Sequence, residues 1–196
     1  MAGKKPPIYG IAETANAMIL LSSRRRAGRQ AAQLIYDAAM AAARRPALYL
    51  DHGVPDTLQG RFEMLALHLF PVLYRLMNVP GDDPELARLV SERLVSETDA
   101  AFREMGVGDV TVPKRMKTFY RSFAGRIGAY TAALESGDEA LADAVRRNVF
   151  PDGGVEENAR SFALYMKAAA DSVRAADLQG LRRGEVPYPA LPSAEE

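Results

Sequence analysis

The chain has 196 residues, a length at which a single domain can bury one substantial hydrophobic core. Hydrophobic residues make up 48% of it and charged residues 26%, which is typical of a globular protein and excludes a largely disordered one. It contains no cysteine, which excludes disulfides, zinc–thiolate sites, iron–sulfur clusters and a thiol nucleophile.

The formal net charge of zero hides four blocks of alternating sign. Residues 1–45 hold eight lysines and arginines against two acids, and residues 46–112 hold five against eleven. Residues 113–135 hold five against one, and residues 136–196 hold seven against eleven. Such blocks either pair with one another in the fold or leave a basic face for an acidic, phosphate-bearing or lipid partner. Composition alone leaves both interpretations open.

The beginning of the chain predicts neither a membrane span nor a signal peptide, because the run IAETANAMILLSS is interrupted by Glu13, Thr14 and Asn16. We interpret residues 1–23 as an N-terminal arm that packs on the domain or frays. The alternative is that it lies on an anionic membrane surface, next to the arginines that follow it. We therefore expect a cytoplasmic protein, with peripheral contact to the inner face of the cytoplasmic membrane as the alternative location.

Apolar residues recur at helical spacing along the whole chain, and no run of alternating β-branched residues predicts a strand. The pattern predicts an all-α fold, a single-domain bundle of about six helices over residues 24–179. The first helix, residues 24–44, is rich in alanine and ends before Pro46.

The stretch HGVPDTLQGRFEMLALHLF, residues 52–70, predicts a stiff turn and then a helix that is apolar on nearly every side. Such a helix is either central to its domain or covered by a partner. We expect Asp56 to cap it, with Gln59 reaching back in a capping box. The predicted turn and cap residues are Gly53, Pro55, Asp56 and Gly60.

Three polar residues of this helix, Arg61, His68 and Arg75, recur every seven positions and so share one side of it. This polar seam either faces water and pairs with acids of the next helix, or borders an apolar groove that orients a bound segment. On the second interpretation, the candidate client-binding residues are Arg61, Phe62, Leu65, His68, Leu69 and Arg75.

A third helix is predicted from Pro84 to Gly106, where the glycine should end it in the left-handed conformation. A fourth helix should open at Pro113 and end near Glu135. The predicted turn and cap residues between them are Gly106, Gly108, Asp109 and Pro113.

Cations stand in the first turns of this fourth helix, where the helix dipole is already positive. Asp99 and Glu104 stand near the negative end of the preceding helix. The two sets either neutralise each other across the loop or leave a corner that receives an anion. The candidate contacts for RNA phosphate, lipid headgroups or an acidic protein surface are Lys114, Arg115, Lys117 and Arg121.

The remaining pattern predicts helices over residues 138–150 and 155–178, and a flexible, proline-rich tail over residues 180–196. No phosphate-binding loop or nucleophile elbow occurs, and His52 and His68 lack the spacing of a helical metal site. We expect no enzymatic activity, no cofactor, no metal and no small-molecule substrate. An enzyme or a haem carrier stays open as a minor alternative.

Two blocks of the sequence resemble the ubiquinol–cytochrome c chaperone family, which comprises assembly factors of the respiratory cytochrome bc complex. The first is AARRPALYLDHGVPDTLQGRFEMLALHLFPVLYRL and the second is FREMGVGDVTVPKRMKTFYRSFAGRIGAY. The resemblance extends over about residues 34–148. It rests on Arg45-Pro46, Tyr49, Gly53–Thr57, Gly60–Phe62, His68, Arg103–Asp109, Val112–Lys117, Gly125, Arg126 and Tyr130. The chain is similar to a bacterial member, since it lacks the long targeting extension of mitochondrial ones.

The resemblance implies a non-enzymatic chaperone that binds an apolar membrane-protein client during assembly of the complex. In mitochondrial relatives the client is newly made cytochrome b. These relatives act with a small helical partner protein and associate with the ribosome, so both are further partners that the resemblance implies. The alternative function is a basic helical module that binds RNA or the ribosome through charge alone.

Overall fold

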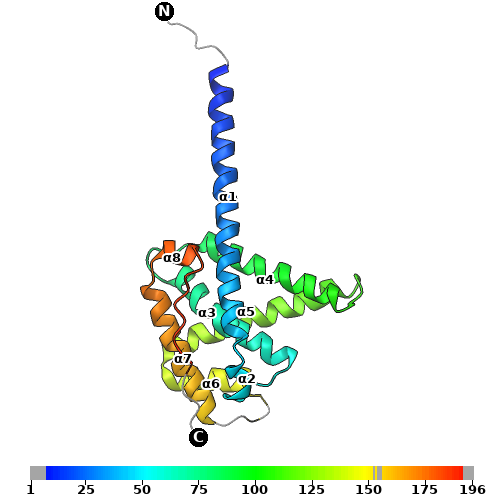
Figure 1. Cartoon of the computed structure of the whole chain (residues 1–196), viewed down its shortest axis with the longest axis vertical. Helices are drawn as coiled ribbons and strands as arrows, with labels where there is room; N and C mark the ends of the chain where they lie inside the picture. Colours follow the sequence, from blue (N-terminus) through cyan, green and yellow to red (C-terminus); the bar gives the residue numbers. More distant parts are fainter. Residues whose placement is uncertain (1–7, 152, 154–155, 192–196) are drawn as a thin grey trace, which may run out of the picture.

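The computed structural model describes residues 8–151, 153 and 156–191, with side chains from residue 20 onward. This part of the chain is helical and contains no strand (Figure 1), which confirms the predicted all-α bundle. The helices are α1 (Ile8–Ala43), α2 (Ala47–Leu50), α3 (Leu58–Asn78), α4 (Pro84–Glu104), α5 (Val112–Ser136), α6 (Asp138–Val149), α7 (Glu156–Ala175) and α8 (Leu178–Arg182). The six predicted helices correspond to α1 and α3–α7, whereas the short helices α2 and α8 were not predicted.

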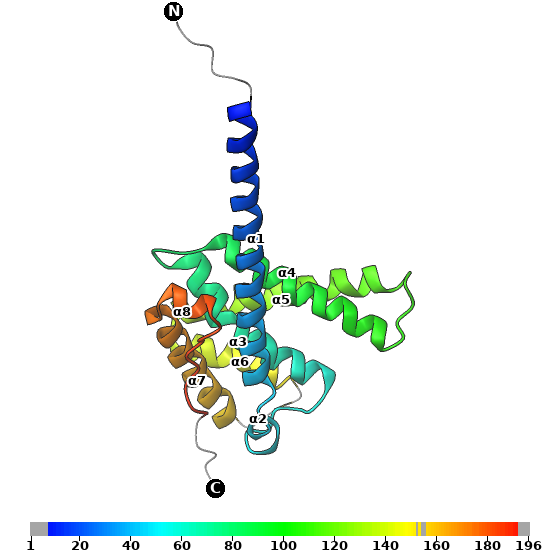
Figure 2. The same cartoon turned by 45° about the horizontal axis from the view of Figure 1, so that its top comes forward.

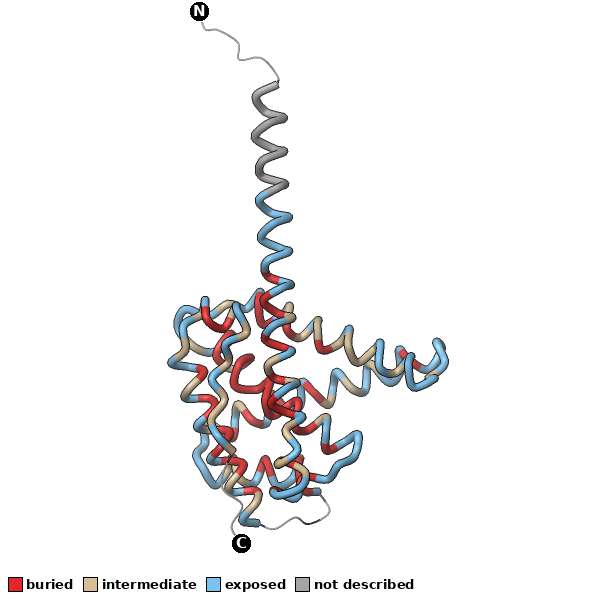
Figure 3. Tube along the Cα trace, viewed as in Figure 1, coloured by how far each residue is buried: buried red, intermediate tan, exposed pale blue. Residues whose placement is uncertain are grey.

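Helix α3 forms the centre of the bundle, where it contacts α1, α4, α5, α6 and α7. Every residue from Glu63 to Leu73 is buried, whichever side of the helix it occupies (Figure 3). A helix that is apolar all round gains most when neighbours cover all of its sides. Of the two alternatives that the sequence leaves open for this helix, the structure shows the central position.

Helix α1 is one continuous helix whose C-terminal half packs on the bundle and whose N-terminal half projects from it (Figure 2). The packed half presents small buried side chains, including Ala31, Ala39 and Ala43, that let other helices approach closely. By contrast, residues 20–27 are all exposed. Residues 8–23, which the sequence assigns to an arm, thus continue the first helix, and residues 1–7 lie outside the described residues. Among the described helices, none has the combined length and hydropathy to cross a membrane.

Helices α4 and α5 form a hairpin that extends sideways from the body of the bundle (Figures 1 and 2). Gly106 has a φ of +77° just beyond α4, which confirms the predicted left-handed helix end. Arg103 closes the loop by pairing with Asp99 at 2.7 Å and with Asp109 at 2.5 Å. The hairpin is therefore held at its tip as well as at its base.

The N-terminal cap of α3 is Thr57, so the predicted cap at Asp56 is wrong by one residue. The Thr57 hydroxyl accepts a hydrogen bond from the backbone N–H of Gly60 at 3.1 Å. Asp56 instead pairs with Arg61 at 2.7 Å, and the guanidinium of Arg61 donates to both oxygens of the carboxylate. Gln59 donates to Glu63 and does not reach back to the turn.

The chain after α8 docks on the bundle and does not form the loose tail that the sequence predicts. We call residues 183–191 the C-terminal strap; it runs beside α7 (Figure 1). Val186, Tyr188 and Leu191 pack against the core, and the Tyr188 hydroxyl donates to the carbonyl oxygen of His68 at 2.7 Å. The prolines of the strap have no backbone N–H to donate, but its apolar side chains still hold it against the bundle. Residues 192–196 lie outside the described part.

We predict that Gly60→Ala destabilises the fold. A Cβ atom at this position would lie 1.9 Å from the carbonyl oxygen of Pro55, so the turn would have to move. We expect the free energy of unfolding, measured by urea denaturation, to fall by about 2–3 kcal/mol. Gly125→Ala is the matched control, since nothing lies within 4 Å of its added Cβ. It should stabilise the helix by about 0.5–1 kcal/mol, and equal losses in both variants would contradict the steric account.

Candidate functional site

The predicted polar seam on α3 does not form a surface. Arg61 is exposed, but His68 is fully buried and Arg75 is 8% exposed. The α7 residue Tyr165 and Tyr188 of the C-terminal strap both contact the His68 ring. His68 and Arg75, together with the buried Leu69, therefore cannot touch a bound segment, and their assignment as client-binding residues is wrong. The seven-residue spacing places residues on one side of a helix but does not reveal what covers that side.

His68 instead joins α3 to two other parts of the bundle. Its Nδ1 donates to the carbonyl oxygen of Met64 at 2.7 Å, which leaves Nε2 as the acceptor. Nε2 lies 3.0 Å from the Tyr165 hydroxyl and 3.3 Å from Nη2 of Arg45, at the end of α1. Burial lowers the pKa of His68 to about 4, and the Arg45 charge adds to this effect while the bond to Met64 opposes it. The imidazole is therefore neutral near pH 7 and acts as a structural connector.

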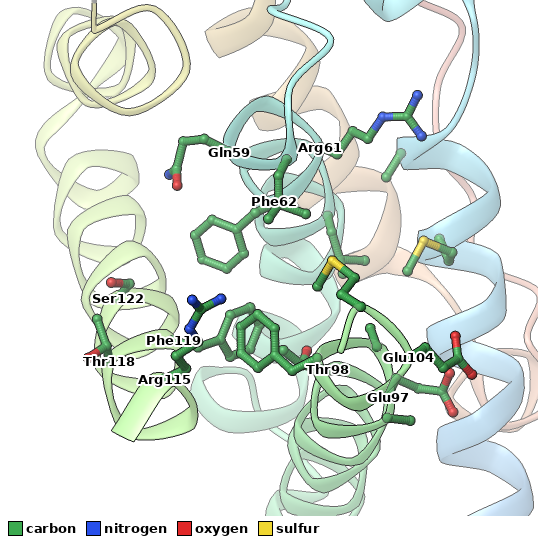
Figure 4. A pocket seen from close by; sticks show the side chains of 18 of the residues that line it. Gln59, Arg61, Phe62, Glu97, Thr98, Glu104, Arg115, Thr118, Phe119 and Ser122 are labelled. Carbon is green, nitrogen blue, oxygen red and sulfur yellow. The ribbon is translucent and has the colours of Figure 1, made fainter. Parts of the chain in front are cut away.

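The exposed part of α3 is its N-terminal end, where a groove of about 1030 Å³ opens between helices (Figure 4). We call it the interhelical groove; α1, α2, α3 and the α4–α5 hairpin line it. Three of the predicted client-binding residues, Arg61, Phe62 and Leu65, belong to its lining. Its large apolar side chains are Met40, Leu58, Phe62, Leu65, Phe102, Met105 and Phe119.

Aromatic rings form the floor of the groove. The rings of Phe62 and Phe119 meet edge to face, with centroids 5.1 Å apart. The guanidinium of Arg115 lies 6.0 Å from the centroid of the Phe102 ring, so this charge is placed over the apolar floor. Leu58 is 68% exposed and Met105 is 54% exposed at the edges. The groove thus offers apolar surface that the folded chain leaves partly uncovered.

Charges of both signs line the groove. Lys114 and Arg115 stand on α5, whereas Asp37, Glu97 and Glu104 stand on α1 and α4. Arg44, just beyond α1, also lines the groove, and Glu97 is paired with Arg93. Figure 4 shows Arg115 on one side and Glu97 and Glu104 across from it. Within the described residues, Glu104, Lys114 and Arg115 form no ion pair, so their charges remain available to a ligand.

The predicted anion-receiving corner is an exposed cationic patch at the start of α5. Lys114, Arg115, Lys117 and Arg121 are all exposed, and none pairs with an acid of the described chain. They do not neutralise Asp99, which pairs with Arg103. The backbone N–H groups of residues 111 and 112 bond to the Gly108 carbonyl, and Pro113 has none. Most of the attraction for an anion here therefore comes from side-chain charge.

Sequence reasoning missed a buried ion pair that fixes α5 against α3. Glu63 is fully buried, and Arg126 donates to its carboxylate through Nε and Nη2 at 2.7–3.2 Å. The hydrogen bonds to Glu63 raise the pKa of Arg126. A signal existed, since Glu63 is the one acid in a helix otherwise rich in apolar residues. Its partner, 63 residues away, could not be read from that pattern.

Comparisons with known proteins agree on one family. Residues 50–188 match the family model described as ubiquinol-cytochrome C chaperone. The crystal structure of the Cbp3 homolog from Brucella abortus is similar, with 34% sequence identity, a TM-score of 0.78, and coverage of 91% of this chain and 99% of that one. Ubiquinol-cytochrome-c reductase complex assembly factor 1 of Xenopus laevis is 26% identical over 96 residues, which are 49% of this chain. The match spans about half, 48%, of the length of that protein.

We predict that His68 makes stability depend on pH. Below its ordinary pKa of 6.5 the unfolded chain binds a proton at this residue, whereas the folded protein does so only near pH 4. The stability that depends on a neutral His68 is therefore fully present above pH 6.5. As pH falls toward 4, the free energy of unfolding loses roughly 3 kcal/mol in total from this residue.

His68→Gln removes this titrating group, so the variant should lose less free energy of unfolding over the same pH range. Urea denaturation of both proteins between pH 7 and 4 measures the difference, from which the carboxylates common to both cancel. Parallel curves for the two proteins would show that His68 is not held neutral by burial.

Proposed function

The chain belongs to the ubiquinol-cytochrome C chaperone family, and on this premise we propose that it is a non-enzymatic assembly factor of ubiquinol–cytochrome c reductase. In this proposal it holds an apolar segment of a membrane-protein client in the interhelical groove. Cytochrome b is the client that fits the family. The observation that carries the proposal is the apolar lining of the groove, which the bundle leaves partly uncovered.

The rest of α3 offers no comparable surface, because its neighbours in the bundle cover it from Glu63 to Leu73. The groove combines rings with flexible methionines, Met40 and Met105, and methionine adapts to client segments of different shape. Binding of this kind requires no bond to be made or broken, which fits a holding role.

The charged walls suit a membrane-protein segment as well. Cytoplasmic flanks of transmembrane helices are rich in lysine and arginine. The acids Asp37, Glu97 and Glu104 lie beside the apolar floor, where they can meet such a flank. We place the protein at the cytoplasmic face of the membrane, where a client first exposes these flanks. A small helical partner protein and contact with the ribosome belong to the same proposal.

A photo-crosslinker tests the site directly. With a photoreactive amino acid at Phe62, in the groove, we expect crosslinks to the unassembled client in cell membranes. Leu164 is the control position, because it is 59% exposed on α7 and lies outside the groove. Equal crosslinking from both positions would argue against the groove as the binding site.

A charge placed in the groove should impair assembly without unfolding the protein. Met105→Asp changes an exposed side chain, 54% accessible, so stability should change by less than about 0.5 kcal/mol. Burying the new carboxylate against an apolar client should weaken binding about tenfold or more. The level of assembled complex in membranes, measured from its haem absorbance, should fall in cells that carry this variant.

Val110→Asp is the matched control, since Val110 is 94% exposed in the hairpin loop and does not line the groove. It adds the same charge and should leave assembly unchanged. Normal levels of the complex in a strain that lacks the protein would defeat the proposed function as a whole.

The same variants separate this proposal from its alternative, an RNA- or ribosome-binding module. Such a module would depend on the exposed cations Lys114, Arg115, Lys117 and Arg121, and its binding would weaken steeply with added salt. Met105→Asp would then have little effect, whereas replacing the cations with glutamine would abolish binding.

A further inference from the structure

The exposed half of α1 carries a dense group of arginines that has no role in the groove. Arg24, Arg25, Arg26 and Arg29 are all exposed, and none forms an ion pair with a described residue. Arg25 is close enough to influence Glu85 of α4, but Glu85 is already paired with Arg88 at 2.7 Å. Successive helical residues are about 100° apart, so these four side chains span an arc of about 200° around α1.

Exposed leucines stand directly beside these arginines. Leu20 is 63% exposed and Leu21 is 56% exposed, one turn nearer the N-terminus. They belong to the exposed stretch of residues 20–27, in the part of α1 that projects from the bundle (Figure 3). We call Leu20, Leu21, Arg24, Arg25, Arg26 and Arg29 the arginine collar. Along α1, apolar side chains are followed by cations. This is the order in which acyl chains are followed by phosphates from the interior of a membrane to its surface.

We propose that the arginine collar of α1 is a docking site for an anionic phospholipid surface. The arginines supply charge that is complementary to lipid phosphates, and their long stems let the charge stay at the headgroups while the chain sinks deeper. The exposed leucines favour lipid over RNA as the ligand, because an RNA backbone offers them no apolar contact. A bilayer buries both kinds of side chain at once.

The collar and the interhelical groove share one rigid element. Met40 lines the groove and lies fourteen residues beyond Arg26 on the same continuous helix. At 1.5 Å per residue the two are about 21 Å apart along the helix axis. On the proposed function, about six or seven extended residues of a client leaving the bilayer would reach the groove. Helix α1 would then set the distance at which a client is held.

Binding of the full-length protein to vesicles tests the proposal. We expect it to co-sediment with vesicles of phosphatidylcholine and phosphatidylglycerol, and much less with pure phosphatidylcholine. Since each arginine at an anionic surface contributes about fivefold, Arg24→Gln/Arg25→Gln/Arg26→Gln should weaken binding by about two orders of magnitude. Leu20→Ser/Leu21→Ser should weaken binding also in low salt, where charge alone is strongest.

The matched control is Lys114→Gln/Arg115→Gln/Lys117→Gln, which removes the same charge from exposed positions on α5. It should keep vesicle binding, and thermal melting should confirm that all variants fold. Unchanged binding in either collar variant overturns the proposal, and so does an equal loss in the α5 variant. Collar-dependent binding to RNA without binding to vesicles would also overturn it. None of these results affects the crosslinking test at Phe62, so failure of the collar and failure of the groove are distinguishable.

Discussion

The burial of α3 from Glu63 to Leu73 is the constraint on which the rest of the structure depends. An apolar helix gains from cover on every side, but α3 also carries Glu63 and His68 into the interior. A buried charge is costly unless a partner and hydrogen bonds accompany it. Arg126 of α5 supplies that partner for Glu63, and Arg45 and Tyr165 satisfy His68. The two buried polar residues of α3, Glu63 and His68, thus determine which parts of α1, α5 and α7 lie against it.

The interhelical groove follows from the same arrangement. Cover of α3 is complete only between Glu63 and Leu73, so Leu58 and Phe62 emerge from the bundle at its N-terminal end. Arg126 binds Glu63 at this level and also lies 5.9 Å from the Phe62 ring, which keeps α5 beside the exposed turn. The α4–α5 hairpin then extends outward and forms the far wall. The apolar floor is therefore a consequence of how the core closes.

Local patterns in the sequence predicted the features that depend on local physics. Helical periodicity, the start of α4 at Pro84 and the left-handed Gly106 each involve only a few neighbouring residues. The failures all involve longer connections. Asp56 pairs with Arg61, five residues away, and leaves the cap to Thr57, whereas the docking of the strap depends on a hydrogen bond between residues 120 positions apart. The groove was half predicted, since Phe62 and Arg115 were named but α1 and α4 were not.

Several of the residues that carry the family resemblance act inside the protein, although most of the others are exposed. Arg45 and His68 belong to the buried hydrogen-bond network, Gly60 fits against the Pro55 carbonyl, and Arg126 neutralises Glu63. Such positions specify the bundle and the shape of the groove, so resemblance at them indicates fold more directly than ligand. Contact with a client would fall instead on rim side chains such as Leu58, which carries no part of the resemblance and can change without disturbing the core. Two chains of this fold can therefore share the whole interior network and still differ in the segment they hold.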